Sequence, residues 1–542
     1  MLRVLAAFIV YAGLALALFG RDVVAAPAHR VIGDGGADKT LYMWTFVWWP
    51  HALGQLRDPL AVDSAWAPVG FDFGWTSGNA GLAVVATPLT ASVGPVVTYN
   101  ALIVLALAVS ASAAFMLARR LTRAFLPALL AGYLYGFSSY QLGHVVGHLP
   151  LVFVAALPAA LHLALRRFEG GLGRCAFVLG LAGLLIAQFL LATEVLFDAA
   201  LLGAVLGPLG WLVLGRDRRL VRVALESVAA LAVCVVCVSP FLLHAVLNGA
   251  AYVPERSAFA ESVDVANVVV PTRLTWLRLP GADDVSSRFT GTTAELGGYL
   301  GLPVLAIALL AAAGRTRPRA PRMLGLALAL SFALSLGPRV KIAGEVVAPG
   351  LWSVIAPLPV AGSALPARLS LFTSLAAALL VALWLAERRS SGRWMLALIG
   401  AVALAPNLGL GLWSANVPRS TFFQQRRYER FLERDDIALV LPYGPAGWSM
   451  LWHAESGMAF RLVGGHFGIH VTPREREWAD VYEGLGTGHM TPARLRAFLA
   501  AHVVTCVVVA PGTRPRAERV VAAAVDHPPV RTADAHVYVV EP

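Results

Sequence analysis

The stretch GDGGADKTLYMWTFVWWPH, residues 33–51, interrupts a chain that is otherwise mostly apolar. It belongs to a polar, acidic and aromatic segment from residue 21 to residue 80, with one hydrophobic run before it and several after it. Asp34 and Asp38 stand four residues apart among glycines in this segment. We predict that it forms a loop that apolar helices hold in place, and that its acidic residues carry the chemistry.

The composition indicates a membrane protein. Of the 542 residues, 58% are hydrophobic and 14% are charged, and the mean hydropathy is +0.69. Soluble domains carry roughly 25% charged residues, and repeated apolar runs of about 20 residues are typical of membrane spans. Lipid requires internally bonded backbones, so spans are helices or closed barrels. The runs lack alternation of period two and therefore predict helices.

Apolar runs and basic clusters together predict the topology. About eleven transmembrane helices are expected, at about residues 4–20, 96–118, 124–142, 149–165, 175–195, 199–215, 223–245, 295–313, 323–337, 367–386 and 394–413. Residues 82–93 are too short to span and are expected to be interfacial or re-entrant. The arginine clusters between spans all fall on one side, which the positive-inside rule assigns to the cytoplasm.

The net charge of +11 does not indicate nucleic-acid binding, because the arginines lie in short connections between spans. The N-terminus is expected in the cytoplasm, on an uncleaved first helix, and the C-terminus outside it. The bias towards Arg, Ala, Gly and Val is typical of GC-rich bacterial genomes. We therefore expect a multi-pass protein of the bacterial inner membrane.

Two domains are expected. Residues 1–414 form the transmembrane domain, including outer loops at 21–80 and 248–294, and residues 415–542 form a small extracytoplasmic α/β domain. Its elements are predicted as strands at 437–441, 503–509 and 536–540 and helices at 491–501 and 516–525, with Thr491 as an N-cap. Residues 419–436 are charged and aromatic with helical spacing.

Asp34 and Asp38 are the candidate catalytic residues. Glycines beside them let the backbone approach a ligand. A carboxylate shielded by the neighbouring tryptophans would be a stronger base than one in water. The alternative is a solvated Asp-Gly turn, with Trp44, Trp48 and Trp49 forming an ordinary membrane-interface belt.

Two pairs at helix ends are candidates for substrate binding. His144 and His148 would share a face of a helix and could bind a phosphate or a metal, but no third metal ligand is identifiable, so no metal site is predicted. Glu194 and Asp198 are also four residues apart. Acids near a bilayer often face a cavity, although both could be simple helix-end residues.

Three further residues complete the candidate binding set. Glu295 and Tyr299 are expected to begin the helix at 295–313, where the helix dipole alone would explain Glu295. Arg368 enters a helix end on the predicted outer side and breaks the charge rule. An arginine there is suited to hold a phosphate.

The order of these features resembles the multi-pass GT-C glycosyltransferases, including a bacterial branch with a C-terminal extramembrane domain. The resemblance covers nearly the whole chain and lies in short motifs: residues 33–38, 66–70, 136–140 with His144 and His148, Glu295 with residues 299–301, residues 366–368, 439–444 and 454–458. It implies a polyprenyl-phosphate-linked sugar donor. It also implies a catalytic acid in the first outer loop, and maps that role onto Asp34 or Asp38.

The sequence thus predicts an α-helical, GT-C-like glycosyltransferase of the membrane. It would move a sugar from a polyprenyl-phosphate donor to a glycan or lipid acceptor at the outer face, by inverting displacement with an Asp base. No nucleotide cofactor is expected, because no Gly-rich nucleotide loop is evident, and dependence on a divalent cation is left open. The alternatives are a flippase for lipid-linked glycans and a non-catalytic scaffold of the envelope.

Overall fold

The computed structural model describes residues 2–36, 38–75, 79–213, 215–247, 257–313, 319–358, 361–444, 447–466 and 473–540. They form two units, each built from segments that are distant in sequence. Unit 1 contains Met1–Arg21, Leu102–Ser239 and Glu255–Trp413. Unit 2 contains Asp22–Ala101, Pro240–Pro254 and Ser414–Pro542.

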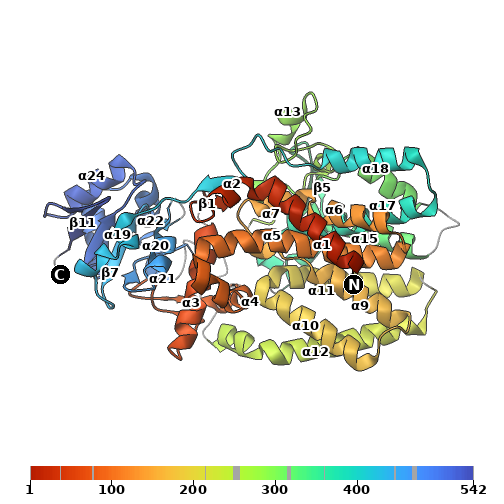
Figure 1. The fold of residues 1–542 in the computed structure, drawn as a ribbon, viewed down its shortest axis with the longest axis horizontal. Helices are drawn as coiled ribbons and strands as arrows, with labels where there is room; N and C mark the ends of the chain where they lie inside the picture. The colour runs from red at the N-terminus through yellow and green to blue at the C-terminus, as the bar shows by residue number, and fades with distance from the viewer. Residues whose placement is uncertain are drawn as a thin grey trace. The chain divides into compact units, whose positions relative to one another are not determined.

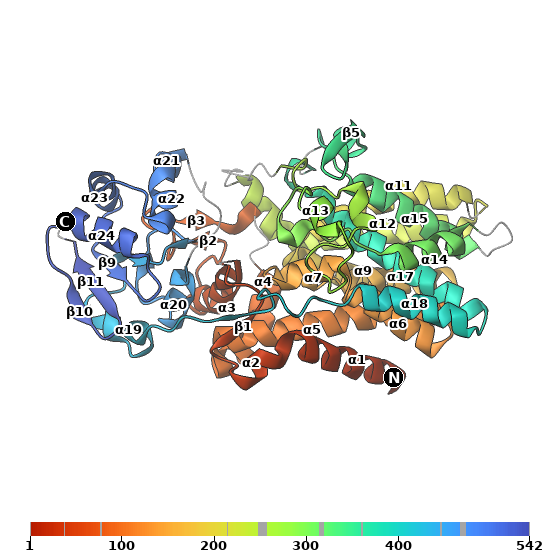
Figure 2. The same ribbon diagram turned by 90° about the horizontal axis from the view of Figure 1, so that it is seen from above.

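Unit 1 is a bundle of apolar helices (Figures 1 and 2). Its long helices are α1 (Leu2–Ala15), α5 (Thr87–Thr122), α6 (Phe125–Gly136), α9 (Ala156–Phe168), α10 (Arg174–Leu191), α11 (Thr193–Val213), α12 (Arg218–Leu247), α14 (Leu302–Ala312), α15 (Arg319–Ser335), α17 (Ser370–Glu387) and α18 (Ser391–Ala403), of which α5 and α12 extend into unit 2. Shorter elements are α7 (Ser139–Val145), α8 (Leu149–Val152), α13 (Ala282–Ser286), α16 (Trp352–Ile355), β4 (Arg339–Ile342) and β5 (Glu345–Pro349).

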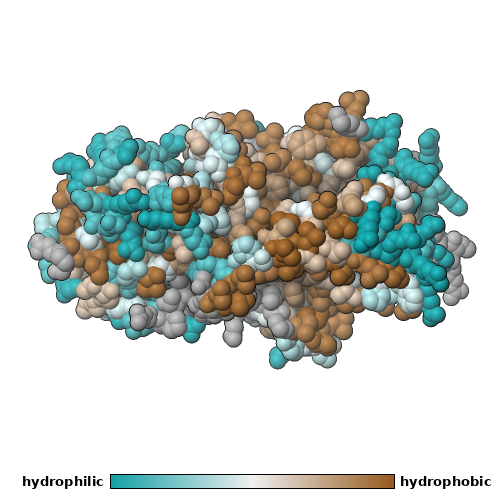
Figure 3. Space-filling view, turned by 90° about the horizontal axis from the view of Figure 1, so that it is seen from below, coloured by the Kyte–Doolittle hydropathy of each residue, from teal (hydrophilic) through white to brown (hydrophobic). Residues whose placement is uncertain are grey.

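Each expected span overlaps one of these helices, so the helical polytopic prediction is confirmed. Within the described residues, seven helices are long and apolar enough to cross a membrane, and three shorter ones are apolar. Side chains such as Leu225, Val228 and Val236 on α12 are more than half exposed, and a broad hydrophobic surface covers this part of the chain (Figure 3). Such a surface is typical of contact with lipid, and together with these helices it indicates an integral membrane protein.

Helix α17 forms the centre of unit 1. Almost all of its side chains are buried, and α6, α14 and α15 pack around it. Because α17 is apolar on every side, it must be enclosed by other helices rather than lie at a surface. The short 3-10 turn of Pro366–Leu369 leads directly into it and places Arg368 at the entrance of the core.

Two helix boundaries that differ from the sequence predictions lie beside glycine and proline. The helix expected from residue 295 begins at Leu302, because Gly297, Gly298 and Gly301 precede it and Gly301 has φ +78°, which glycine adopts readily. The last helix ends at Ala403 rather than near 413, before a segment that contains Pro406, Gly409 and Gly411. Both ends follow from the cost of glycine and proline inside helices.

Residues 82–93 were expected to be separate from the next span. They form α4 (Ala80–Val85) and the first turns of α5, and the non-helical backbone of Gly94, with φ +81°, separates these turns from the rest of α5, which holds the next span. The expected separation is therefore present as a kink. In the other predicted outer loop, residues 248–256 lie outside the described residues. Its remainder is irregular apart from α13 and two 3-10 turns, at Val265–Val268 and Thr293–Glu295.

Unit 2 contains a five-stranded sheet in the order β10-β11-β9-β7-β8. The strands are β7 (Ile437–Leu441), β8 (Arg461–Leu462), β9 (Cys506–Val509), β10 (Val530–Thr532) and β11 (Ala535–Val539). The buried strands β7 and β9 are parallel, with Leu439 opposite Val507, and β11 is antiparallel to β9. Helices α20 (Ser449–Glu455), α22 (Ala479–Thr487), α23 (Pro492–Ala501) and α24 (Pro515–Ala524) accompany the sheet. The small α/β region is confirmed, including the cap at Thr491, whose hydroxyl accepts from Arg494 N–H.

The charged stretch 419–436 is not one helix, despite its spacing. It contains only α19 (Thr421–Gln424) and a 3-10 turn at Arg427–Arg430. Phe422 and Phe423 are buried, and the carboxylate of Asp534 accepts from the backbone N–H groups of Thr421 and Phe422. Tertiary contacts therefore override the local helical preference in this stretch.

The predicted first outer loop folds into unit 2 together with the C-terminal part of the chain. It contributes α2 (Arg21–Ala25), β1 (Arg30–Ile32), α3 (Asp38–Gly54), β2 (Ala61–Val62) and β3 (Phe71–Asp72). Strand β1 pairs with β6 (Ser414–Asn416). Ala65 bridges to Leu462 at the β8 edge of the sheet. The unit boundary after Trp413 lies beside the predicted domain boundary, but the loop belongs to unit 2 rather than to the helical unit.

Candidate active site

Asp34 and Lys39 form an ion pair at the start of α3. Asp34 Oδ1 accepts from Lys39 Nζ at 2.7 Å and from Gly36 N–H at 2.8 Å. The lysine is fully buried, and burial lowers its pKa while the neighbouring Asp34 and Asp38 act in the opposite direction. A buried ammonium is costly unless it is paired, so Asp34 serves as the counterion of Lys39.

Asp38, in the first turn of α3, has a different partner. Its Oδ1 lies 2.5 Å from Nε2 of His466, which follows β8 and is separated from Asp38 by 428 residues. The Asp38 side chain is 43% exposed, and that of His466 is 20% exposed. A carboxylate that is both accessible and paired with an imidazole is suited to proton transfer.

Trp44 and Trp48 are buried side chains of the same helix. Their rings stack at 5.3 Å, and the Trp44 indole N–H donates to His453 Nδ1 at 2.9 Å. His453 Nε2 lies 2.8 Å from Phe460 O and so carries the ring proton. Burial lowers the pKa of His453 to about 4. Trp44, Trp48 and Trp49 are all at most 4% exposed, so the interpretation as a membrane-interface belt is wrong.

A second cluster of candidate residues lies in unit 1, around the buried guanidinium of Arg368. Its Nε and Nη2 donate to Glu295 Oε1 at 3.0 Å and 2.9 Å, and its Nη1 donates to Glu194 Oε2. Glu194 Oε1 also accepts from Leu365 N–H at 2.7 Å. Arg368 thereby connects α11, the 3-10 turn of Thr293–Glu295 and the start of α17.

Several buried polar groups near this triad lack a hydrogen-bond partner among the described residues. They are both carboxylate oxygens of Asp198, Glu295 Oε2, the Tyr140 hydroxyl, both ring nitrogens of His144 and the Ser370 hydroxyl. Asp198 interacts electrostatically with Glu194, Arg368 and Glu295. The Tyr140 and His144 ring centroids are 4.2 Å apart. Buried polar groups are normally bonded, so this concentration of unbonded groups favours a polar ligand.

Two glycines allow the elements of this cluster to approach closely. A Cβ on Gly143 would lie 2.4 Å from Ala294 O, and one on Gly297 would lie 2.8 Å from the Tyr140 Cα. Real Cβ contacts are longer than this, so α7 and residues 293–297 can pack at this distance only because both positions are glycine. The packing places Glu295 against the helix that carries Tyr140 and His144.

The predicted site residues thus fall into separate groups. Glu194, Glu295 and Arg368 come together. His144 and His148 are neighbours with ring centroids 5.6 Å apart, although α7 ends between them. Tyr299 is buried over Gly301, whose Cβ would lie 3.1 Å from its hydroxyl. Asp34 and Asp38 lie in unit 2.

Sequence reasoning missed Lys39 and His466. Lys39 carried a local signal, because it is a lone lysine at the start of an aromatic, apolar helix next to Asp38. His466 carried none, since only the tertiary fold brings it to Asp38. No group of three or more His, Cys, Asp or Glu side chains that could hold a metal ion occurs within the described residues.

Comparisons with known proteins give matches among solved structures. No protein-family model matches the chain, and no curated protein matches its sequence at a significant level. The arabinofuranosyltransferase AftD from Mycobacteria matches with a TM-score of 0.63 and 14% identity, over 99% of this chain and 40% of that one. The chain therefore spans about two fifths of the mycobacterial protein's length.

The archaeal oligosaccharyltransferase AglB from Archaeoglobus fulgidus also matches. Its complex with an inhibitory peptide and a dolichol-phosphate has a TM-score of 0.52 and 11% identity, over 94% of this chain and 69% of that one. An apo crystal structure of the Archaeoglobus fulgidus oligosaccharyltransferase has a TM-score of 0.55 and 10% identity, over 93% and 69%. At such identities the similarity establishes the fold, and this chain has the GT-C-like fold that its motifs implied.

Proposed function

We propose that this chain is a membrane glycosyltransferase that moves a sugar from a polyprenyl-phosphate donor to a glycan or lipid acceptor. Its fold is that of proteins whose names include an arabinofuranosyltransferase and an oligosaccharyltransferase. Fold alone does not determine function. The observation that carries the proposal is the Asp38–His466 pair, a carboxylate that is partly accessible and bonded to an imidazole.

Asp38 acts as the general base in this proposal. It takes the proton of the acceptor hydroxyl while the acceptor oxygen forms a bond to the anomeric carbon of the donor sugar. The bond from that carbon to the phosphate oxygen breaks through an oxocarbenium-like state, and its electron pair leaves with the polyprenyl phosphate. The configuration at the anomeric carbon inverts. His466 orients the carboxylate and supports its charge.

Asp34 has a positioning role. Its Oδ1 is occupied by the Lys39 ammonium and the Gly36 N–H, whereas the Asp38 contact comes from a side chain that can share a proton. The Asp34–Lys39 pair holds the turn at residues 33–36 against the first turn of α3. This division of labour between the two aspartates goes beyond what the sequence distinguished.

The cluster in unit 1 is proposed as a binding site for a polar ligand. His144 and Tyr140 offer unbonded buried polar atoms, and His148 and Tyr299 belong to the same proposed binding set. Arg368 is already engaged by Glu194 and Glu295. A donor phosphate that bound it would have to displace a carboxylate, so we assign Arg368 the role of holding these two glutamates in place.

The proposed location is a bacterial inner membrane, with the N-terminus in the cytoplasm and the C-terminal part outside. Transfer would then occur at the outer face, where the polyprenyl-linked sugar would be the donor in place of a sugar nucleotide. The arginine clusters between spans support this orientation through the positive-inside rule. Reaction of a membrane-impermeant probe with cysteines introduced on either side of a span tests it.

The decisive experiment measures transfer from a panel of polyprenyl-phosphate pentoses and hexoses by the full chain in liposomes. Asp38→Asn should lower turnover by about 10²–10⁴-fold, the usual contribution of a general base. Asp63→Asn is the matched control, because Asp63 lies in the same loop and is exposed in an ion pair with Arg57. Wild-type turnover by folded Asp38→Asn protein would refute the assignment of the base.

His466 needs a separate readout, because it acts through Asp38. His466→Gln keeps a hydrogen-bond donor and should retain more turnover than His466→Leu, with the acceptor KM unchanged in both. Equal losses in the two variants would show that the imidazole serves packing only. Transport of a lipid-linked glycan without any sugar transfer would instead favour a flippase.

A further inference from the structure

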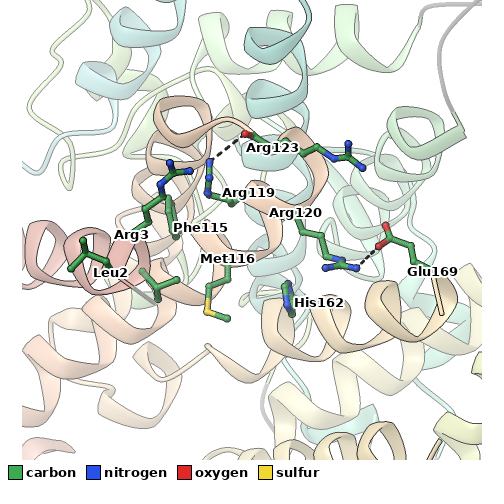
Figure 4. Close-up of a pocket in the computed structure, with 10 residues that line it drawn as sticks. Leu2, Arg3, Phe115, Met116, Arg119, Arg120, Arg123, His162 and Glu169 are labelled. Atoms are coloured by element: carbon green, nitrogen blue, oxygen red, sulfur yellow. Dashed lines mark hydrogen bonds and ion pairs between the residues drawn. The ribbon is translucent and has the colours of Figure 1, made fainter. Parts of the chain in front are cut away.

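A basic cavity of about 670 Å³ lies at one end of the helices of unit 1. Helix α1 contributes Leu2, Arg3 and Val4, the last turns of α5 contribute Phe115, Met116, Arg119 and Arg120, and Arg123, His162 and Glu169 complete the lining (Figure 4). This cavity is distinct from both clusters of candidate residues described above. Its lining combines cationic and apolar side chains from three segments of the chain.

The charges of the lining are unbalanced. Arg120 forms an ion pair with Glu169, but within the described residues no carboxylate pairs with Arg3, Arg119 or Arg123. Arg119 Nη1 donates only to the backbone oxygen of Arg123, at 3.3 Å (Figure 4). Three like charges gathered around one cavity repel one another unless an anion lies between them.

Two other arginines at helix ends in unit 1 pair with nearby acids. Arg167, at the end of α9, forms a bidentate pair with Glu226, with distances of 2.6 Å and 2.7 Å. Arg393 lies 3.4 Å from Glu387. Arg3, Arg119 and Arg123 have no such acid among the described residues, and the cavity brings them together with apolar side chains.

The apolar part of the lining restricts the type of anion. Leu2 is 80% exposed and Met116 is 39% exposed, and they lie with Val4 and Phe115 beside the guanidinium groups. Exposed apolar side chains on a membrane helix face acyl chains. A ligand that fits both parts carries a phosphate and hydrocarbon on the same molecule.

We propose that this cavity binds the phosphate headgroup of an anionic membrane phospholipid. The phosphate lies among Arg3, Arg119 and Arg123, and the acyl chains run along the apolar side chains of α1 and α5. Basic pockets between transmembrane helices are suited to such headgroups. The bound lipid links the first turn of α1 to the end of α5, adding to the bond from Tyr11 Oη to Leu129 O at 2.7 Å, which anchors α1 further along.

The test is native mass spectrometry of the full chain in detergent, titrated with phosphatidylglycerol or phosphatidylcholine. Phosphatidylglycerol should bind preferentially, and the preference should weaken at high salt. Each arginine near a lipid phosphate contributes roughly a fivefold gain in affinity, so Arg119→Gln/Arg123→Gln should bind about 30-fold more weakly. The matched control is Arg388→Gln/Arg389→Gln, an exposed pair at the end of α17, which should bind as the wild type does.

Three results would overturn the proposal. The first is equal binding of the two lipids, and the second is an equal loss of binding in the control variant. The third is competition by millimolar inorganic phosphate that is as effective as competition by the lipid, because that result would identify a site for free anions. If the double variant fails to fold, Arg3→Gln replaces it, because Arg3 is exposed in the first turn of α1. A fivefold loss of phosphatidylglycerol binding in Arg3→Gln supports the lipid site, and an unchanged affinity contradicts it.

Discussion

The buried triad of Glu194, Arg368 and Glu295 allows a prediction whose size follows from its geometry. At the 2.9 Å separation of Arg368 Nη2 and Glu295 Oε1, an effective dielectric constant of about 20 gives roughly 6 kcal/mol of gross attraction. Desolvation of the three groups offsets most of this gain. Removing the cation alone takes away the charge that both carboxylates pair with, which costs about 3–5 kcal/mol.

We therefore expect Arg368→Met to destabilise the protein by about 3–5 kcal/mol, or between ~100-fold and ~5,000-fold in the folding equilibrium constant. The triple variant Arg368→Met/Glu194→Gln/Glu295→Gln carries no charge in the triad and should recover most of this stability. Arg388→Met is the control, because Arg388 is exposed just beyond the same helix, and it should change stability by less than about 0.5 kcal/mol.

The assay is unfolding of purified protein in mixed micelles, followed by tryptophan fluorescence as the denaturing detergent fraction rises. The argument fails if Arg368→Met unfolds at the same fraction as the wild type, or if the triple variant is no more stable than the single one. Sugar transfer by the triple variant adds a second readout. A stable triple variant without activity would show that the reaction requires these charges.

Three further predictions concern single positions in the two units. Gly143→Ala would place its Cβ 2.4 Å from Ala294 O, and the resulting shift of the backbone should cost about 1–3 kcal/mol of stability. The same unfolding assay measures this loss, and wild-type stability in the variant would contradict the close packing. Asp34→Ala removes the carboxylate that accepts from the buried Lys39 ammonium and should cost about 3 kcal/mol at pH 7. Because burial lowers the Lys39 pKa, this loss should shrink as pH rises and the lysine becomes neutral, and a loss independent of pH would refute the pairing. His453 has a folded pKa of about 4 against about 6.5 unfolded, so the unfolded chain binds its proton more tightly. Stability should therefore fall by up to about 3 kcal/mol as pH drops from 6.5 to 4, and His453→Gln should remove that part of the acid dependence.

The positions of the helices were predictable, because they depend on local properties of the chain. An apolar run of this length without alternation of period two forms a helix in lipid, since only helices and closed barrels satisfy the backbone hydrogen bonds there. Within unit 1, α9, α10 and α17 therefore lie where hydropathy predicts them. The cap at Thr491 was also local. The errors in helix boundaries at Leu302 and Ala403 occurred where glycine or proline interrupts an apolar run.

The candidate site was predictable only in part. Polar residues at the ends of apolar helices identified Glu194, Glu295 and Arg368, because charge near a bilayer is costly and is kept only with a partner or a role. The sequence did not reveal that both glutamates accept hydrogen bonds from Arg368. Arg368 is separated from Glu194 by 174 residues and from Glu295 by 73, and no local pattern encodes such a pairing.

The sequence by itself determined that this chain is a bundle of membrane helices with acidic and aromatic residues between spans and a small α/β region near its C-terminal end. Only the tertiary structure decided that the first loop folds with that region, that Asp34 neutralises Lys39, and that Asp38 meets His466. The physical reason is that hydropathy and backbone bonding act between neighbours in sequence. The partner of a side chain depends instead on which distant segments pack beside it.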